Sequence, residues 1–185
     1  MNNTRIEYFM NVMLYFAWLH EKNFSISTQR VFDKIICFFS LIFFTKKFRK
    51  NFHFNLENNR KLQNKSNIDK KNGFYITKAM YWFGYLSSSI PGFFTFIVLG
   101  FVLRIFNEIT PFGILILSAI PIALTCILDH AYLYSHDKYI EYFKQFEKED
   151  EKWHKKWYSI SIIFYIGCIM LYIVGGFIIL AIAIL

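Results

Sequence analysis

Long apolar runs separated by short polar breaks dominate the chain after residue 78. Residues 79–106 and 111–134 form two such runs, and a third, residues 157–185, contains no charged side chain. Each run exceeds the roughly 20 residues with which an α-helix crosses a ~30 Å hydrocarbon core. An α-helix is stable in lipid because it satisfies its own backbone hydrogen bonds. The pattern therefore predicts three membrane-spanning helices, the first two joined as a hairpin.

The N-terminal part of the chain is apolar in two shorter stretches. Residues 6–20 carry apolar side chains on almost every side, with Asn11 as the main exception. We predict an interfacial helix there, with aromatic rings at headgroup level; a helix packed on the rest of the bundle is the alternative. Residues 23–30 are expected to be a connector that caps the next helix. Residues 31–45 predict a short fourth span, with a re-entrant or half-buried helix as the alternative.

Two features inside the spans predict close contacts or bends. Three serines at residues 87–89 precede Pro91, and serine hydroxyls can bond to carbonyls that proline leaves free, so a kink is expected there. Ala119 and Ala123 form a small-x-x-x-small pair, and Gly175 and Gly176 thin the last span. Small residues let helices approach closely, either within one chain or between copies.

Composition and charge agree with a membrane protein. A soluble domain of 185 residues has no interior large enough for a chain that is 55% hydrophobic, so lipid must cover part of it. Residues 46–78 contain ten Lys/Arg and two Asp/Glu, a balance of +8 that equals the net charge of the whole chain. Positive charge favours the cytoplasmic side. We therefore predict a bacterial inner-membrane protein with residues 46–78, a flexible or loosely helical basic loop, and residues 135–156 in the cytoplasm.

Residues 135–156 carry six basic and six acidic side chains around an aromatic face. Four Tyr and Phe residues recur at i, i+3, i+4 and i+7, the spacing of an amphipathic helix. The second span is therefore expected to continue as a stalk, to reverse near residues 147–151, where four acids cluster, and to return with two Trp residues against the aromatic face. We assign this aromatic set to a cytoplasmic protein partner. Its members are Tyr139, Tyr142, Phe143, Phe146, Trp153 and Trp157.

Four titratable residues at the end of the second span are the candidates for a ligand or metal site. Asp129 and His136 are seven residues apart, as are His130 and Asp137, so each pair would share one face of a regular helix. A metal needs three or four converging ligands, and only pairs are present, so a wet polar collar is the competing interpretation. The chain contains no HExxH, GxSxG, GxxxxGK[ST] or GxGxxG motif. We therefore favour a non-enzymatic protein and predict no cofactor.

The basic residues that follow the predicted fourth span are candidates for binding anionic lipid, since each Lys or Arg near the surface contributes about 1 kcal/mol. They are Lys46, Lys47, Arg49 and Lys50. Nucleic acid is the alternative partner, but the segment has few aromatic rings for stacking bases. We therefore do not expect nucleic-acid binding.

The sequence YIEYFKQFEKEDEKWHKKWYSISIIFYIG, residues 139–167, resembles a tail of small uncharacterised bacterial membrane proteins. A looser resemblance is to the membrane accessory proteins beside RNA-targeting type VI-B CRISPR effectors. Some of those carry a ribonuclease-like Arg-x4–6-His motif, whereas Arg49 and His53 here are too close together. The resemblance implies an accessory role in anti-phage defence, and it transfers no nuclease residue to this chain.

Together these features predict an all-α polytopic membrane bundle, with residues 1–185 as a single membrane domain and a cytoplasmic helical hairpin as its extension. The leading functional hypothesis is a non-enzymatic membrane accessory protein that recruits a partner or oligomerises and perturbs the membrane, for example as a pore. A small transporter or channel is the second hypothesis, because of the Ser/Pro kink. A membrane enzyme that uses Asp129, His130, His136 and Asp137 is the third.

The charge pattern predicts that both polar segments lie on the same side of the membrane. Tags introduced at Asn58 and Glu149 are therefore expected to be labelled together by an impermeant reagent only after the membrane is opened. Labelling of one tag but not the other in intact spheroplasts would contradict this topology.

Overall fold

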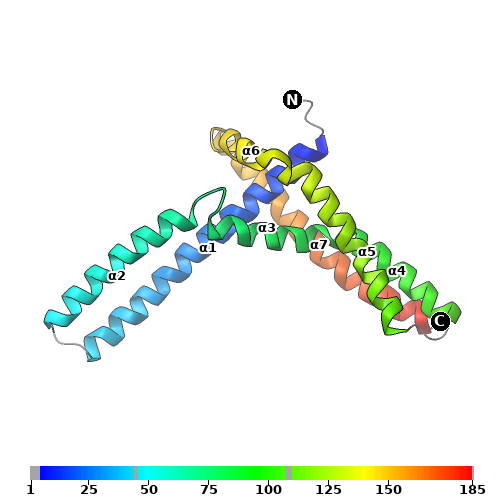
Figure 1. The fold of residues 1–185 in the computed structure, drawn as a ribbon, viewed down its shortest axis with the longest axis horizontal. Coiled ribbons are helices and arrows are strands. Elements are labelled where there is room, and N and C mark those ends of the chain that lie inside the picture. The colour runs from blue at the N-terminus through cyan, green and yellow to red at the C-terminus, as the bar shows by residue number, and fades with distance from the viewer. Residues whose placement is uncertain (1–4, 44–45, 107–109, 185) are drawn as a thin grey trace. The chain divides into compact units, whose positions relative to one another are not determined.

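The computed structural model describes residues 5–43, 46–106 and 110–184, and these residues are almost entirely helical, with no strand among them (Figure 1). This confirms the predicted all-α fold. The described residues divide into two compact units, one formed by Met1–Phe16 with Tyr81–Leu185 and the other by Ala17–Met80. The helices, in order, are α1 (Arg5–Phe43), α2 (Lys46–Asn67), α3 (Phe74–Ser87), α4 (Ser89–Phe106), α5 (Pro111–Asp129), the π-helix η1 (His130–Tyr134), the 3₁₀-helix η2 (Ser135–Asp137), α6 (Lys138–Phe146) and α7 (Glu151–Ile184).

Among the described residues, three helical stretches are long and apolar enough to cross a membrane. They are Phe74–Ile105, Pro111–Tyr134 and Glu151–Ile182, and the chain buries only 11–17% of their most apolar windows. Large apolar side chains on these stretches therefore need lipid or another protein around them. These are the three predicted spans. The predicted fourth span, residues 31–45, falls in the second half of α1, and its last two residues lie outside the described part, so it stays a prediction.

The unit Ala17–Met80 is more regular than the sequence pattern indicated. The predicted connector at residues 23–30 is wrong, because α1 runs through it without a Gly or Pro to stop it. The Thr28 hydroxyl donates a hydrogen bond to the carbonyl of Phe24, with 2.8 Å between the two oxygens. This bond lies inside the helix and is not a helix cap. The polar segment 46–78, predicted as a flexible or loosely helical loop, begins with the 22-residue helix α2, which agrees with the helical alternative. Arg60 of α2 pairs with Asp33 of α1, which ties the two helices together.

The predicted kink among the serines is present as a break between α3, which ends at Ser87, and α4, which begins at Ser89. The hydroxyls of Ser87 and Ser88 donate to the carbonyls of Gly84 and Tyr85 at 3.1 and 2.7 Å. The break places Pro91 in the first turn of α4, where a backbone N–H would have no partner in the helix. Proline therefore costs this helix no hydrogen bond.

In the unit that contains the last two spans, α4 packs against both α5 and α7. Glycines set the approach of α4 to α7. A Cβ on Gly175 would overlap the ring of Phe96, and one on Gly100 would lie 3.1 Å from Cβ of Ile182. By contrast, a Cβ on Gly176 would meet nothing within 4 Å. The two adjacent glycines of the last span thus have different surroundings, and Gly175 permits close packing of α7 on α4 within the chain.

The two adjacent glycines provide a matched pair of variants. Gly175→Leu is expected to destabilise the protein by about 1–3 kcal/mol, because an overpacked contact forces side chains and backbone apart. Gly176→Leu points into open space and should leave stability nearly unchanged. Unfolding in mixed micelles measures both, and equal effects from the two variants would contradict the α4–α7 packing.

Candidate functional site

The second span does not continue as one regular helix. After Asp129 the backbone switches to the π-helix η1, in which Ser135 N–H donates to His130 C=O, and then to the 3₁₀-helix η2. Asp137 closes this segment with a left-handed φ of 55°, a conformation that Asp tolerates better than most residues. The predicted stalk is present as α6, but an irregular turn separates it from α5. Because the helical repeat changes between residues 129 and 137, a seven-residue spacing no longer places two side chains on one face.

The four candidate metal or ligand residues consequently have different surroundings. Asp129 is the last residue of α5 and is 4% exposed, so it is not part of a wet collar. His130 is exposed and Asp137 is half-buried, and the side chain of His136 lies outside the description. Among the described residues no three His, Cys, Asp or Glu side chains converge on one point.

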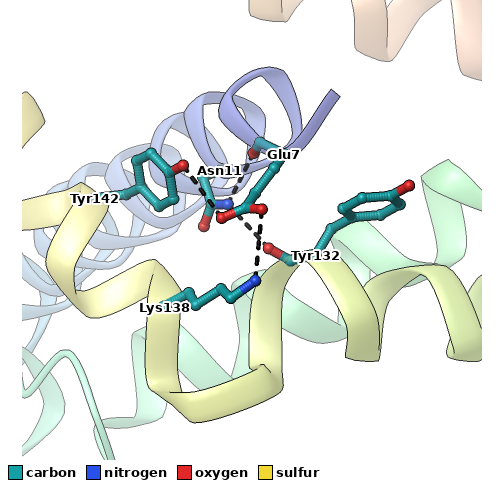
Figure 2. Close-up of polar contacts among 5 residues, drawn as sticks. All are labelled: Glu7, Asn11, Tyr132, Lys138 and Tyr142. Atoms are coloured by element: carbon teal, nitrogen blue, oxygen red, sulfur yellow. Dashed lines mark hydrogen bonds and ion pairs between the residues drawn. The ribbon is translucent and has the colours of Figure 1, made fainter. Parts of the chain in front are cut away.

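A buried polar cluster instead joins the start of α1 to the irregular turn. Asn11 is fully buried, and its Nδ2 donates to the carbonyl of Glu7 at 2.8 Å and to the carbonyl of Tyr132 at 3.1 Å (Figure 2). Tyr132 belongs to η1, where the π-helical pattern displaces carbonyls from their regular partners. Asn11 thus satisfies a backbone group that the irregular turn exposes to the interior.

Glu7 is the charged member of this cluster and is 7% exposed. Its Oε1 accepts a hydrogen bond from the Tyr142 hydroxyl at 3.2 Å, and its Oε2 lies 3.5 Å from Lys138 Nζ (Figure 2). A buried carboxylate requires such partners, because removing a charge from water is costly. Burial, and then the negative charge of Glu7, raise the pKa of Tyr142 to about 12. The phenol therefore stays protonated and remains a donor.

The aromatic face of α6 packs inside the chain. Tyr139, Tyr142, Phe143 and Phe146 are all at most 3% exposed. Tyr15 of α1 contacts Phe143 and Phe146 with ring centroids 5.1 and 5.5 Å apart.

The returning helix α7 packs against the aromatic face of α6, as predicted. Trp153 stacks on Phe146 with ring centroids 5.1 Å apart, and its Nε1 donates a hydrogen bond to the Tyr8 hydroxyl at 3.2 Å. Trp157 also contacts the Tyr8 ring, at 5.9 Å between centroids. The chain itself therefore occupies the surface assigned to a partner. Residues 12–16 of α1 are at most 3% exposed, which favours the packed alternative for residues 6–20 over the interfacial one.

A cavity of about 380 Å³ lies among α1, α4, α5, α7 and the last turn of α3. Most of its wall is apolar, and its polar lining residues are Arg5, Ser87, Thr125 and Asp129. The apolar ones are Ile6, Phe9, Met10, Ile90, Pro91, Leu128 and Phe164. The cavity brings together Asp129, the candidate ligand residue in the second span, and the serine next to the break between α3 and α4.

Sequence reasoning found part of this arrangement. It singled out Asn11 and Asp129 but missed Glu7 and Lys138. A usable signal was present, because Glu7 and Asn11 are four residues apart in an apolar run and so share one helix face. The predicted lipid-binding residues Lys46, Lys47, Arg49 and Lys50 lie at the start of α2, where side chains are outside the description, so that assignment stays a prediction.

Comparison of the chain with protein-family models, with curated proteins and with solved structures finds no significant match.

The cluster predicts that Asn11→Ala is strongly destabilising. The variant leaves the carbonyl of the half-buried Tyr132 without its donor, at an expected cost of about 1–3 kcal/mol. Asn23→Ala, at an exposed position of the same helix, is the control and should change stability little. Unfolding monitored by circular dichroism in detergent measures both, and a neutral Asn11→Ala would show that the cluster does not hold α1 in place.

Proposed function

We propose that the protein is a non-enzymatic membrane protein that assembles with further copies of itself in the bilayer and alters the permeability of the membrane. The observation that carries this proposal is the surface of α5. This span buries only Pro121, Thr125 and Asp129, which recur every four residues and so form one narrow stripe. The rest of its surface is available to lipid or to a neighbouring protein.

The exposed side of α5 has a character suited to helix contacts. Ala119 and Ala123 are both exposed, one turn apart, with Ser118 beside them. A small-x-x-x-small pair lets two backbones approach closely in lipid, where close packing rather than water exclusion drives association. Self-assembly is favoured over recruitment of a partner through the α6 aromatics, because those side chains are already buried.

The proposed setting is a bacterial inner membrane with the two polar segments in the cytoplasm. The supports are the concentration of Lys and Arg in residues 46–78 and the tendency of basic segments to stay on that side. A role in anti-phage defence rests on the resemblance alone; a pore formed by several copies would suit such a role by dissipating ion gradients in an infected cell.

Light scattering of the purified protein in detergent tests the assembly. The wild type is expected to exceed the mass of one chain, and Ala119→Leu with Ala123→Leu should shift it to the monomer and abolish potassium release from loaded vesicles. Ala181→Leu, at an exposed position of the last span, is the control and should retain both properties. A monomeric wild type that causes no potassium release would refute the proposal.

A small transporter is the second candidate function, and the observation that favours it is the cavity beside Asp129. A carboxylate buried within a span commonly marks a substrate or ion path. Uptake or release that depends on Asp129 and persists in a monomeric variant would favour this candidate over self-assembly.

A further inference from the structure

We infer that the cavity beside Asp129 is a binding site for an amine carried on an apolar chain, which enters from the membrane. This inference goes beyond the proposed assembly, because it names a ligand chemistry and concerns the buried side of α5 rather than its exposed side.

The carboxyl group of Asp129 supplies the polar end of the site. It is 4% exposed, and its Oδ1 is buried without a hydrogen-bond partner among the described residues. A Cβ on Gly84 would lie only 3.4 Å from the other oxygen, Oδ2, so α3 lies close to the carboxyl group. Oδ2 thus lies against α3, while Oδ1 is buried without a donor. A buried carboxylate in this state is stabilised by a cation that also donates a hydrogen bond.

No cation of the described chain takes that place. Arg5 lines the same cavity but is exposed, and the ion pairs among the described residues involve neither Arg5 nor Asp129. The lysine of the polar cluster, Lys138, is engaged with Glu7. The ligand must therefore bring its own positive charge, and an ammonium group matches both the charge and the missing donor.

The walls determine the rest of the ligand. Phe9, Met10 and Phe164 line the cavity with apolar surface, and its volume of about 380 Å³ is within the range of small-molecule pockets. Ile90 and Leu128, also in the lining, are about half exposed on helices that can span a membrane. An apolar rim at lipid depth admits a hydrocarbon chain from the bilayer more readily than a hydrated solute.

Binding of dodecylamine to the purified protein in maltoside detergent tests the inference, with dodecanol as the uncharged probe of equal length. The wild type is expected to bind the amine saturably and at least tenfold more tightly than the alcohol. Asp129→Asn should remove that preference. Glu141→Gln, which removes one negative charge at an exposed position of α6, should retain it.

A second variant keeps the test independent of how Asp129→Asn folds. Leu128→Trp leaves the carboxylate in place but fills the cavity, so it should weaken amine binding at least tenfold while the circular dichroism spectrum stays unchanged. Equal binding of amine and alcohol by the wild type, or unchanged amine binding in both cavity variants, would overturn the inference. The mass of the assembly in detergent is read separately, so a failure here is distinct from a failure of the proposed function.

The same assay separates two sources of the amine. Displacement of dodecylamine by phosphatidylethanolamine, but not by phosphatidylglycerol, would identify the headgroup of an aminophospholipid as the ligand. If neither lipid displaces the bound probe, the ligand is a free long-chain amine. Displacement by both lipids equally would show that the acyl chain alone is recognised, and it would overturn the role of Asp129.

Discussion

In the part of the molecule that contains the spans, the protein itself buries only a small share of the apolar side chains. Its three apolar stretches bury at most 17% of their most apolar windows within the chain. In water, the isoleucine, leucine and phenylalanine side chains on their outer surfaces would each carry a hydrophobic penalty of roughly 1.5–3 kcal/mol. Lipid removes that penalty, so the chain needs only narrow contacts between helices. The close approach of α4 to α7 at Gly175 and the thin buried stripe of α5 are contacts of this kind.

The end of the bundle near α6, unlike the spans, has an interior that the protein itself fills. There the chain builds a dense aromatic interior from α1, α6 and α7, in which Tyr15, Phe143 and Phe146 pack edge to face. This interior also encloses polar groups, and those groups must be paired. The Asn11 Nδ2 group and the Glu7 carboxylate are paired in this way, and they join α1 to the irregular turn after α5 and to α6. A helix packed only by apolar contacts could slide; the hydrogen bond from Asn11 to the Tyr132 carbonyl defines one register of α1 against the turn.

The irregular turn after α5 links these two regions. The change from α-helix to π-helix and then to 3₁₀-helix redirects the chain into α6 and releases the Tyr132 carbonyl for Asn11. It also leaves Asp129 at the end of α5, facing the cavity rather than water. Assembly through the exposed side of α5 would leave this cavity on the opposite side of the helix, so the two proposed activities are compatible.

Hydropathy determined the all-α architecture and the three spans, because both depend on local composition and on the length of a helix in lipid. The four acids at residues 147–151 located the reversal between α6 and α7. The break between α3 and α4 followed from Pro91 and its serines for the same reason. Tertiary structure decided what the pattern could not: that α1 runs on through residues 23–30, that the α6 aromatics are buried by the chain itself, and that Asn11 bonds a carbonyl 121 residues away. A helical repeat reports which side chains share a face. Which surface meets that face, and whether the repeat survives past Asp129, depends on contacts that form only when the distant segments pack together.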